Sequence, residues 1–272
     1  MPRPGASSIS FPAFRGTTRR LILANLIAYF ALLLTGALSR SAAEWMVGVF
    51  AFIPGFFLHG SLWQPLTYSF IHQGILGTAL ELLSLWFLAG FLEPMHNSSW
   101  VAGLYGSSVI GTALAAAVIF IVCGTFGFLL PLIPLYGCFG GIFGLLVAFG
   151  VLYGDMEFMM FPLPISIKAR YLAIIYALIA VAMMFGEQRM YAFAQLGGGL
   201  AGMLFIRFAP RRGISFVFSE QWYGLRNRYY RWKRRRAAKK FEVYMRSQGR
   251  TVRFDGSGKQ IDEDSNDKKR WN

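Results

Sequence analysis

Apolar residues occur along this chain in long runs that are separated by short polar segments. A helix needs about 20 apolar residues to cross a bilayer core about 30 Å thick. Six stretches reach or nearly reach that length by their hydropathy: 20–38, 75–94, 100–123, 134–153, 169–186 and 190–208. The pattern therefore predicts an all-α membrane protein with six transmembrane helices.

The composition supports this interpretation and argues against a soluble domain. Of the 272 residues, 55% are hydrophobic and only 15% are charged, which is too apolar for a typical globular protein. The first apolar run follows Arg19 and Arg20 and lacks a small-residue cleavage site before the next polar segment. We therefore expect it to be a retained helix rather than a cleaved signal peptide.

Residues 39–74 form an unusually apolar connection between the first two predicted spans. The segment is interrupted by Pro54 and Pro65, so it cannot form one spanning helix. It is rich in aromatic residues, which favour the boundary between lipid and water: Trp45, Phe50, Phe52, Phe56, Phe57, Trp63 and Phe70. We expect an amphipathic loop in the outer membrane interface.

Positive charge gathers at the two ends of the chain. The net charge is +14, and residues 207–272 contain 19 basic and 7 acidic residues, a surplus of 12. Because cytoplasmic flanks collect Lys and Arg, both termini are expected in the cytoplasm, which requires an even number of spans. The predicted organisation is a disordered N-terminus (1–19), a membrane domain (20–208) and a basic cytoplasmic tail (209–272) whose end is disordered. The predicted location is the cell (inner) membrane.

The basic tail allows three interpretations. The first is a solvated anchor that follows the positive-inside rule and needs no partner. The second is docking on anionic lipid, which the tail's aromatic residues would suit: Trp222, Tyr223, Tyr229, Tyr230 and Trp232. Nucleic-acid binding is not expected, because a charge run without a binding fold is a weak signal.

Glycines recur four residues apart in the fourth and sixth predicted spans. Such spacing lets helix backbones approach closely in lipid, where the hydrophobic effect does not drive helix association. The predicted packing positions are Gly137, Gly140, Gly141, Gly144, Gly198 and Gly202. We expect these two spans to form a tight pair at the centre of the bundle.

Several motifs in this order are similar to those of one known family. They are Leu62 to His72 before the second span, Leu92-Glu93 after it, Gly137-x-x-Gly140, and Ala194-Gln195-Leu196-Gly197-Gly198 in the sixth span. Over residues 20–208 the chain resembles the rhomboid family of intramembrane serine proteases (peptidase S54-like). The resemblance implies a compact rhomboid-like six-helix bundle.

The catalytic positions of that family are not retained. The resemblance places Phe139 at the serine nucleophile, Gln195 at the histidine base, and Gly77 and Glu81 at the oxyanion donors. A serine mechanism needs nucleophile, base and oxyanion donors together. We therefore predict no catalytic residues and a pseudoprotease, leaning against enzymatic activity.

The cysteines and histidines do not indicate an alternative catalytic or metal site. Cys138 adjoins the lost serine, but neighbouring residues on a helix point about 100° apart, so its side chain is expected to face elsewhere. Cys123 and Cys138 are interpreted as unpaired packing residues. The three histidines, at 59, 72 and 96, show no clustering with cysteine. No metal site and no cofactor are predicted.

Glu81 is expected to avoid lipid because a charged group inside a membrane is costly. In one hypothesis it is protonated and hydrogen-bonds to Gln195, while Phe139 fills the space used by water and substrate in active relatives. In the other it extends to a water-filled outer cavity. The sequence leaves both open.

The resemblance implies binding of transmembrane segments of client proteins without cleavage. Glu81, Gln195 and Cys138 are the predicted polar contacts, with the lipid bilayer as the other partner. The alternative is a serine-type endopeptidase that uses residues not recognised here. A transporter is less favoured, since Glu81 and Gln195 are too few deep polar groups for an ion path.

Overall fold

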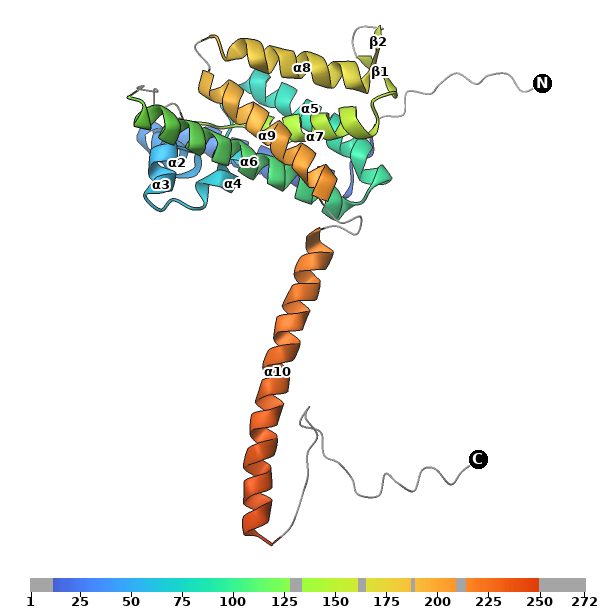
Figure 1. The fold of residues 1–272 in the computed structure, drawn as a ribbon. Coiled ribbons are helices and arrows are strands. Elements are labelled where there is room, and N and C mark those ends of the chain that lie inside the picture. Colours follow the sequence, from blue (N-terminus) through green and yellow to red (C-terminus); the bar gives the residue numbers. More distant parts are fainter. Residues whose placement is uncertain (1–11, 128–133, 161–164, 187–188, 209–213, 250–272) are drawn as a thin grey trace, which may run out of the picture. The chain divides into compact units, whose positions relative to one another are not determined.

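The computed structural model describes residues 12–127, 134–160, 165–186, 189–208 and 214–249. These residues are mostly helical (Figure 1). The longer helices are α1 (Gly16–Leu38), α2 (Arg40–Phe50), α5 (Ile75–Met95), α6 (Ser98–Thr125), α7 (Phe139–Leu152), α8 (Ala169–Met183), α9 (Arg189–Phe208) and α10 (Ile214–Ser247). The chain divides into two compact units, Met1–Ile214 and Ser215–Asn272.

Helix α7 lies inside the first unit and packs against α5, α6, α8 and α9 (Figure 1). Glycine permits this close packing. A Cβ atom at Gly202 would lie 2.9 Å from the Cα of Gly144, and one at Gly140 would overlap the side chain of Thr112. Backbones can approach this closely only where no side chain separates them.

Three of the described helices are long and apolar enough to cross a membrane, namely α1, α5 and α6. Helices α7 and α8 are apolar but have only 14 and 15 residues, so α7 would be about 21 Å long at about 1.5 Å per residue. That is shorter than a bilayer core of about 30 Å. The chain is a helical membrane protein, and its six-span count stays a prediction.

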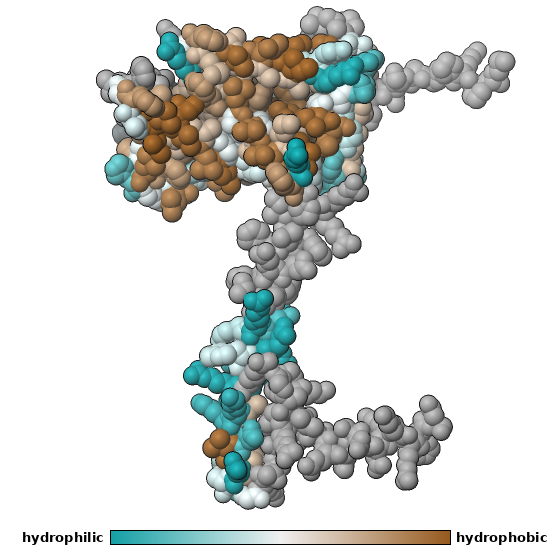
Figure 2. Space-filling model, in the orientation of Figure 1, coloured by the Kyte–Doolittle hydropathy of each residue, from teal (hydrophilic) through white to brown (hydrophobic). Residues whose placement is uncertain are grey.

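The apolar connection between α1 and α5 folds into short helices. These are α2, α3 (Pro54–Leu58), α4 (Gln64–Thr67) and the 3-10 helix η1 (Tyr68–Phe70). The two prolines that break the pattern lie in the first turns of α3 and α4, where a missing N–H costs nothing. Exposed large apolar side chains, Trp45 among them, cover this region, and hydrophobic colour dominates the visible face of the first unit (Figure 2).

The predicted disordered N-terminus was too long at its C-terminal end. Helix α1 begins at Gly16, and Thr17 and Thr18 are buried. The Glu93 carboxylate at the end of α5 accepts hydrogen bonds from the Thr17 N–H at 2.6 Å, the Thr18 N–H at 3.0 Å and the Thr18 hydroxyl at 2.6 Å. The Ser98 hydroxyl also donates to it. A carboxylate at a helix N-terminus satisfies free N–H groups and complements the helix dipole.

Two further segments contain elements that the hydropathy pattern did not predict. The connection between the predicted spans 134–153 and 169–186 contains an antiparallel pair, β1 (Glu157–Met160) and β2 (Ile165–Lys168). The basic tail contains α10, a helix of 34 residues. The described side chains of α10 are mostly exposed, so packing contributes little to this helix. Its Arg, Lys, Ala and Glu residues are good helix formers and favour it by their intrinsic propensity.

Candidate functional site

The start of α7 is fixed by backbone hydrogen bonds to η1 and the residue that follows it. Gly137 has φ of 93°, a left-handed conformation that glycine adopts without steric cost. Its N–H donates to the carbonyl oxygens of Ile71 at 2.7 Å and Tyr68 at 3.2 Å. The residues just before α7 and those just before α5 are thereby held side by side.

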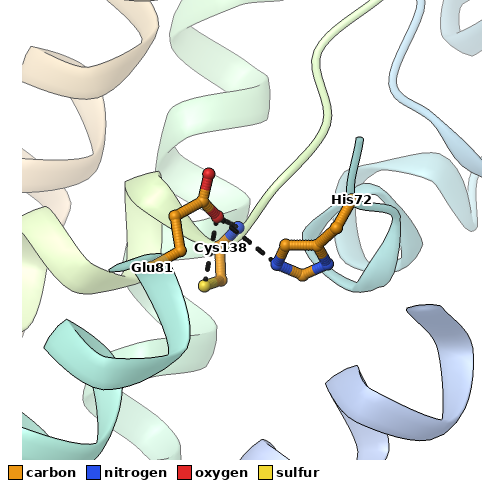
Figure 3. Close-up of side chains that lie close together, drawn as sticks. All are labelled: His72, Glu81 and Cys138. Carbon is orange, nitrogen blue, oxygen red and sulfur yellow. Dashed lines mark hydrogen bonds and ion pairs between the residues drawn. The ribbon is translucent and has the colours of Figure 1, made fainter. Parts of the chain in front are cut away.

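Three side chains from separate segments meet at this point (Figure 3). Oε2 of Glu81 accepts hydrogen bonds from the Cys138 N–H at 2.8 Å and the Cys138 thiol at 3.4 Å. Nε2 of His72 lies 3.3 Å from the same oxygen. The ligand-type atoms of the three residues all lie within 4.8 Å of one another. We refer to His72, Glu81 and Cys138 as the three-residue cluster.

Two residues of the cluster are buried, and the third is partly exposed to solvent. The His72 side chain is 1% exposed, whereas that of Glu81 is 31% exposed, and Cys138 is buried. Nδ1 of His72 lies 3.2 Å from the carbonyl oxygen of Phe70. A carbonyl only accepts, so Nδ1 carries the proton and Nε2 faces Glu81.

The structure corrects two expectations about these residues. The Cys138 side chain does not face away from the site. Cys138 is the N-cap of α7 and lies before the first helical residue, so the rotation of about 100° between neighbouring helical residues does not apply to it. Glu81 bonds to Cys138, and no hydrogen bond joins it to Gln195 in the described part of the chain. Its partial exposure agrees in part with the hypothesis of an outward-reaching carboxylate.

Phe139, which the rhomboid resemblance placed at the serine position, packs between two tyrosines. Its ring centroid lies 6.5 Å from that of Tyr68 and 5.2 Å from that of Tyr191. Tyr68 donates its hydroxyl to the Val109 carbonyl at 2.9 Å. Burial raises the pKa of Tyr68 far above the usual value for a phenol, so the hydroxyl remains a donor.

The other predicted positions lie around this core. Tyr191 is one turn before the half-buried Gln195 on α9, so Phe139 packs near the start of the helix that carries the predicted base position. Gly77 is exposed, and a Cβ there would meet no described atom within 4 Å. The structure thus brings Glu81 and Cys138 together and leaves Gly77 apart from them.

His72 was missed as a site residue, although it ends the motif that carried the family resemblance. Metal sites are recognised in a sequence by closely spaced Cys and His residues, and residues 72, 81 and 138 show no such spacing. They converge only because the segment before α5 and the segment before α7 are hydrogen-bonded to each other.

Comparison with known proteins identifies a family for this chain. The profile of the family described as "Eukaryotic integral membrane protein (DUF1751)" matches residues 22–220. No curated protein matches the chain. The match confirms an integral membrane protein. The particular membrane and the cytoplasmic termini stay predictions.

Proposed function

Since the chain belongs to the eukaryotic integral membrane protein family (DUF1751), we propose that it is a rhomboid-like membrane protein that binds transmembrane segments of client proteins without cleaving them. The resemblance over residues 20–208 supplies the rhomboid part of the proposal. The arrangement at the start of α7 supplies the argument against hydrolysis.

The observation that carries the proposal is the packing of Phe139. Its ring contacts Tyr68 and Tyr191 at the position where the resemblance requires a serine. A phenyl ring has no proton to transfer and no lone pair for attack. The aromatic contacts also occupy the space that water and a substrate carbonyl would need beside a nucleophile.

Glu81 opposes hydrolysis for a second reason. Its carboxylate accepts the Cys138 N–H at the start of α7, a place where helix N-termini favour negative charge. Acyl transfer requires donors directed at a developing negative oxygen. Here the donor is already engaged by a fixed carboxylate, which would repel that oxygen.

The route for client binding is the lateral surface of α5 and α8. Both helices pack against α7. Helix α5 exposes Leu76, Leu80 and Leu83 at the spacing of one helix face, and α8 exposes Ile174 and Leu178. In a bilayer such faces meet lipid or another transmembrane helix, and small polar sites beside them favour helix association.

Crosslinking tests the client proposal. A photoreactive residue at position 80 on α5 should give discrete adducts with membrane proteins in native membranes. The matched control is position 34 on α1, where Leu34 is also exposed and apolar. Equal capture at both positions would mean that α5 only faces lipid, and the client proposal would fail.

Activity labelling tests the absence of hydrolysis. We expect no labelling of the purified protein by a serine-reactive fluorophosphonate and no cleavage of a transmembrane substrate. Ser108 is the matched variant, because it is buried in α6 and its hydroxyl has no hydrogen-bond partner in the described residues. Labelling that disappears in Ser108→Ala would establish the endopeptidase alternative instead.

The basic tail supports a proposal about orientation. Described basic side chains of α10 such as Arg228, Arg231 and Lys233 are exposed, as the positive-inside rule and docking on anionic lipid both require. Protease protection of tagged termini in sealed vesicles should show both termini on the cytoplasmic side. Opposite sides for the two tags would exclude an even number of spans.

A further inference from the structure

The three-residue cluster contains the donor set of a transition-metal site. Imidazole, carboxylate and thiolate are the groups that bind zinc in proteins. A thiolate together with an imidazole disfavours Mg²⁺ and Ca²⁺, which prefer oxygen ligands. Each residue offers one ligand atom, and the three come from the segment before α5, from α5 itself and from the N-cap of α7.

The separations between these atoms match a tetrahedral metal. With bonds of about 2.0–2.3 Å, tetrahedral zinc holds its ligand atoms about 3.3–3.8 Å apart. The separation from Oε2 of Glu81 is 3.3 Å to Nε2 of His72 and 3.4 Å to Sγ of Cys138. The third separation is within 4.8 Å, so a small side-chain rotation would complete the triangle.

The groups that face one another in the cluster offer a cation several ligand atoms. Nδ1 of His72 donates to the Phe70 carbonyl, which leaves Nε2 as the ring atom directed at Glu81. Oε2 of Glu81 already accepts from Cys138 and also presents lone pairs. Nε2 is buried and is not aligned for a hydrogen bond with any described residue. A metal ion between Nε2 and Oε2 would give the buried Nε2 a partner.

We propose that His72, Glu81 and Cys138 bind a zinc-class divalent cation. Binding releases the Cys138 thiol proton to solvent, and the metal–sulfur bond forms in its place. Three protein ligands leave a fourth coordination position for water or a small ligand, and the partly exposed Glu81 marks the open side. The proposal does not depend on the proposed client-binding function.

Outer contacts of the cluster favour a metal site over a cysteine–histidine nucleophile. Metal-binding histidines usually donate their other N–H to a carbonyl, and ligating carboxylates are themselves hydrogen-bonded. His72 and Glu81 both show these contacts. Figure 3 shows Glu81 linked to both partners, so the carboxylate rather than the imidazole is the hydrogen-bond partner of the thiol.

The test uses the full-length protein in detergent after removal of metal with a chelator. Zn²⁺ should then bind at one equivalent per chain, as measured by elemental analysis. Co²⁺ should give a thiolate-to-cobalt charge-transfer band together with the intense visible bands of tetrahedral coordination. This spectrum reports the ligands directly, so a purely structural role of the cysteine cannot produce it.

Variants assign the ligands. Cys138→Ser should abolish the charge-transfer band, and His72→Gln and Glu81→Gln should each weaken Zn²⁺ binding about 100-fold or more, since outer-shell changes alone cost about 10–100-fold. Cys123→Ser is the matched control, because Cys123 is the other free thiol, and it should bind as the wild type does. Thermal unfolding of each metal-free variant checks that it is folded.

Three outcomes would overturn the proposal. The wild-type protein could bind no Zn²⁺ at micromolar concentration, the cobalt spectrum could lack a thiolate band, or the band could disappear in Cys123→Ser instead. The first two outcomes need no variant, so they remain decisive even if Cys138→Ser fails to fold.

Discussion

Helix α5 carries one glutamate near each end, and the two carboxylates have opposite surroundings. Glu93 is 8% exposed and accepts hydrogen bonds from two backbone N–H groups and two hydroxyls. Glu81 is 31% exposed and accepts bonds only from Cys138 among the described residues, with the His72 ring 3.3 Å away. On the same helix, the Glu93 carboxylate therefore has four hydrogen-bond donors, whereas the Glu81 carboxylate has donors from one residue only among those described.

The difference separates a structural carboxylate from a binding site. Glu93 has donors for its charge from α1 and from the start of α6, so it holds three helices together and has little capacity left for a ligand. Glu81 faces the His72 ring and the Cys138 thiol, and these three groups form the cluster that we propose as a metal site.

The largest effect is expected from Glu93→Gln. The amide keeps one acceptor oxygen but loses the charge, and hydrogen bonds to charged groups contribute about 1.5–3 kcal/mol each. We expect a loss of about 3 kcal/mol in the free energy of unfolding, measured by chemical denaturation in detergent. The matched control is Glu44→Gln, because Glu44 forms an exposed ion pair with Arg40 and such pairs contribute little. Similar losses in the two variants would contradict the structural role of Glu93.

Each of the two glutamates lies beside a glycine in a left-handed conformation. Gly16 has φ of 58° and Gly137 has φ of 93°. A Cβ at Gly16 would overlap Oε1 of Glu93, and one at Gly137 would lie 2.8 Å from Oε2 of Glu81. Alanine in this conformation costs about 1–2 kcal/mol. Gly16→Ala should cost more because it also displaces Glu93, whereas Gly137→Ala should mainly weaken Zn²⁺ binding.

Gly60→Ala is the control for backbone strain alone. Gly60 has φ of 112°, and a Cβ there would meet no described atom within 4 Å. Thermal unfolding of the three alanine variants should rank Gly16→Ala as the most destabilised. If Gly60→Ala lost as much stability as Gly16→Ala, strain rather than displacement of the carboxylate would explain the loss.

Glu81→Gln should have a smaller effect on stability. The glutamine carbonyl can still accept the Cys138 N–H, so we expect a loss below about 1 kcal/mol without metal. A ligand that binds only the folded state stabilises by about 2.7 kcal/mol at 100 times its Kd. Saturating Zn²⁺ should therefore stabilise the wild type and Glu93→Gln but not Glu81→Gln. A zinc-induced shift in all three would place the metal elsewhere.

The sequence predicted the long helices, but it did not predict where α1 and α7 begin or what their first residues contact. Long apolar runs predicted α1, α5 and α6, because each helix is long and apolar enough to cross a membrane. It did not predict that Thr17 and Thr18 bond to Glu93, because residues 75 positions apart carry no local signal. His72, Glu81 and Cys138 were missed as a group for the same reason. The orientation predicted for Cys138 was wrong because α7 begins at Phe139, so Cys138 lies before the helix rather than within it.

The smallest expected effect is a pH dependence of stability that arises from His96, close to Glu93 at the C-terminal end of α5. His96 is the C-cap of this helix and stacks on Trp100 with ring centroids 3.8 Å apart. Burial lowers the pKa of His96 below its ordinary value of 6.5, although the Leu92 carbonyl acts in the opposite direction. The unfolded chain therefore binds the proton more readily than the folded protein.

Stability should be complete above the unfolded pKa of 6.5 and should decrease as the pH falls below it toward the folded pKa. His96→Phe keeps an aromatic ring against Trp100 and removes the titrating group, so its unfolding midpoint should change less between about pH 7.5 and about pH 5.5. His59→Gln, at an exposed position, should retain the wild-type dependence. An unchanged pH profile in His96→Phe would show that another group causes the acid loss, and the Glu93 end would then contribute to stability without sensing pH.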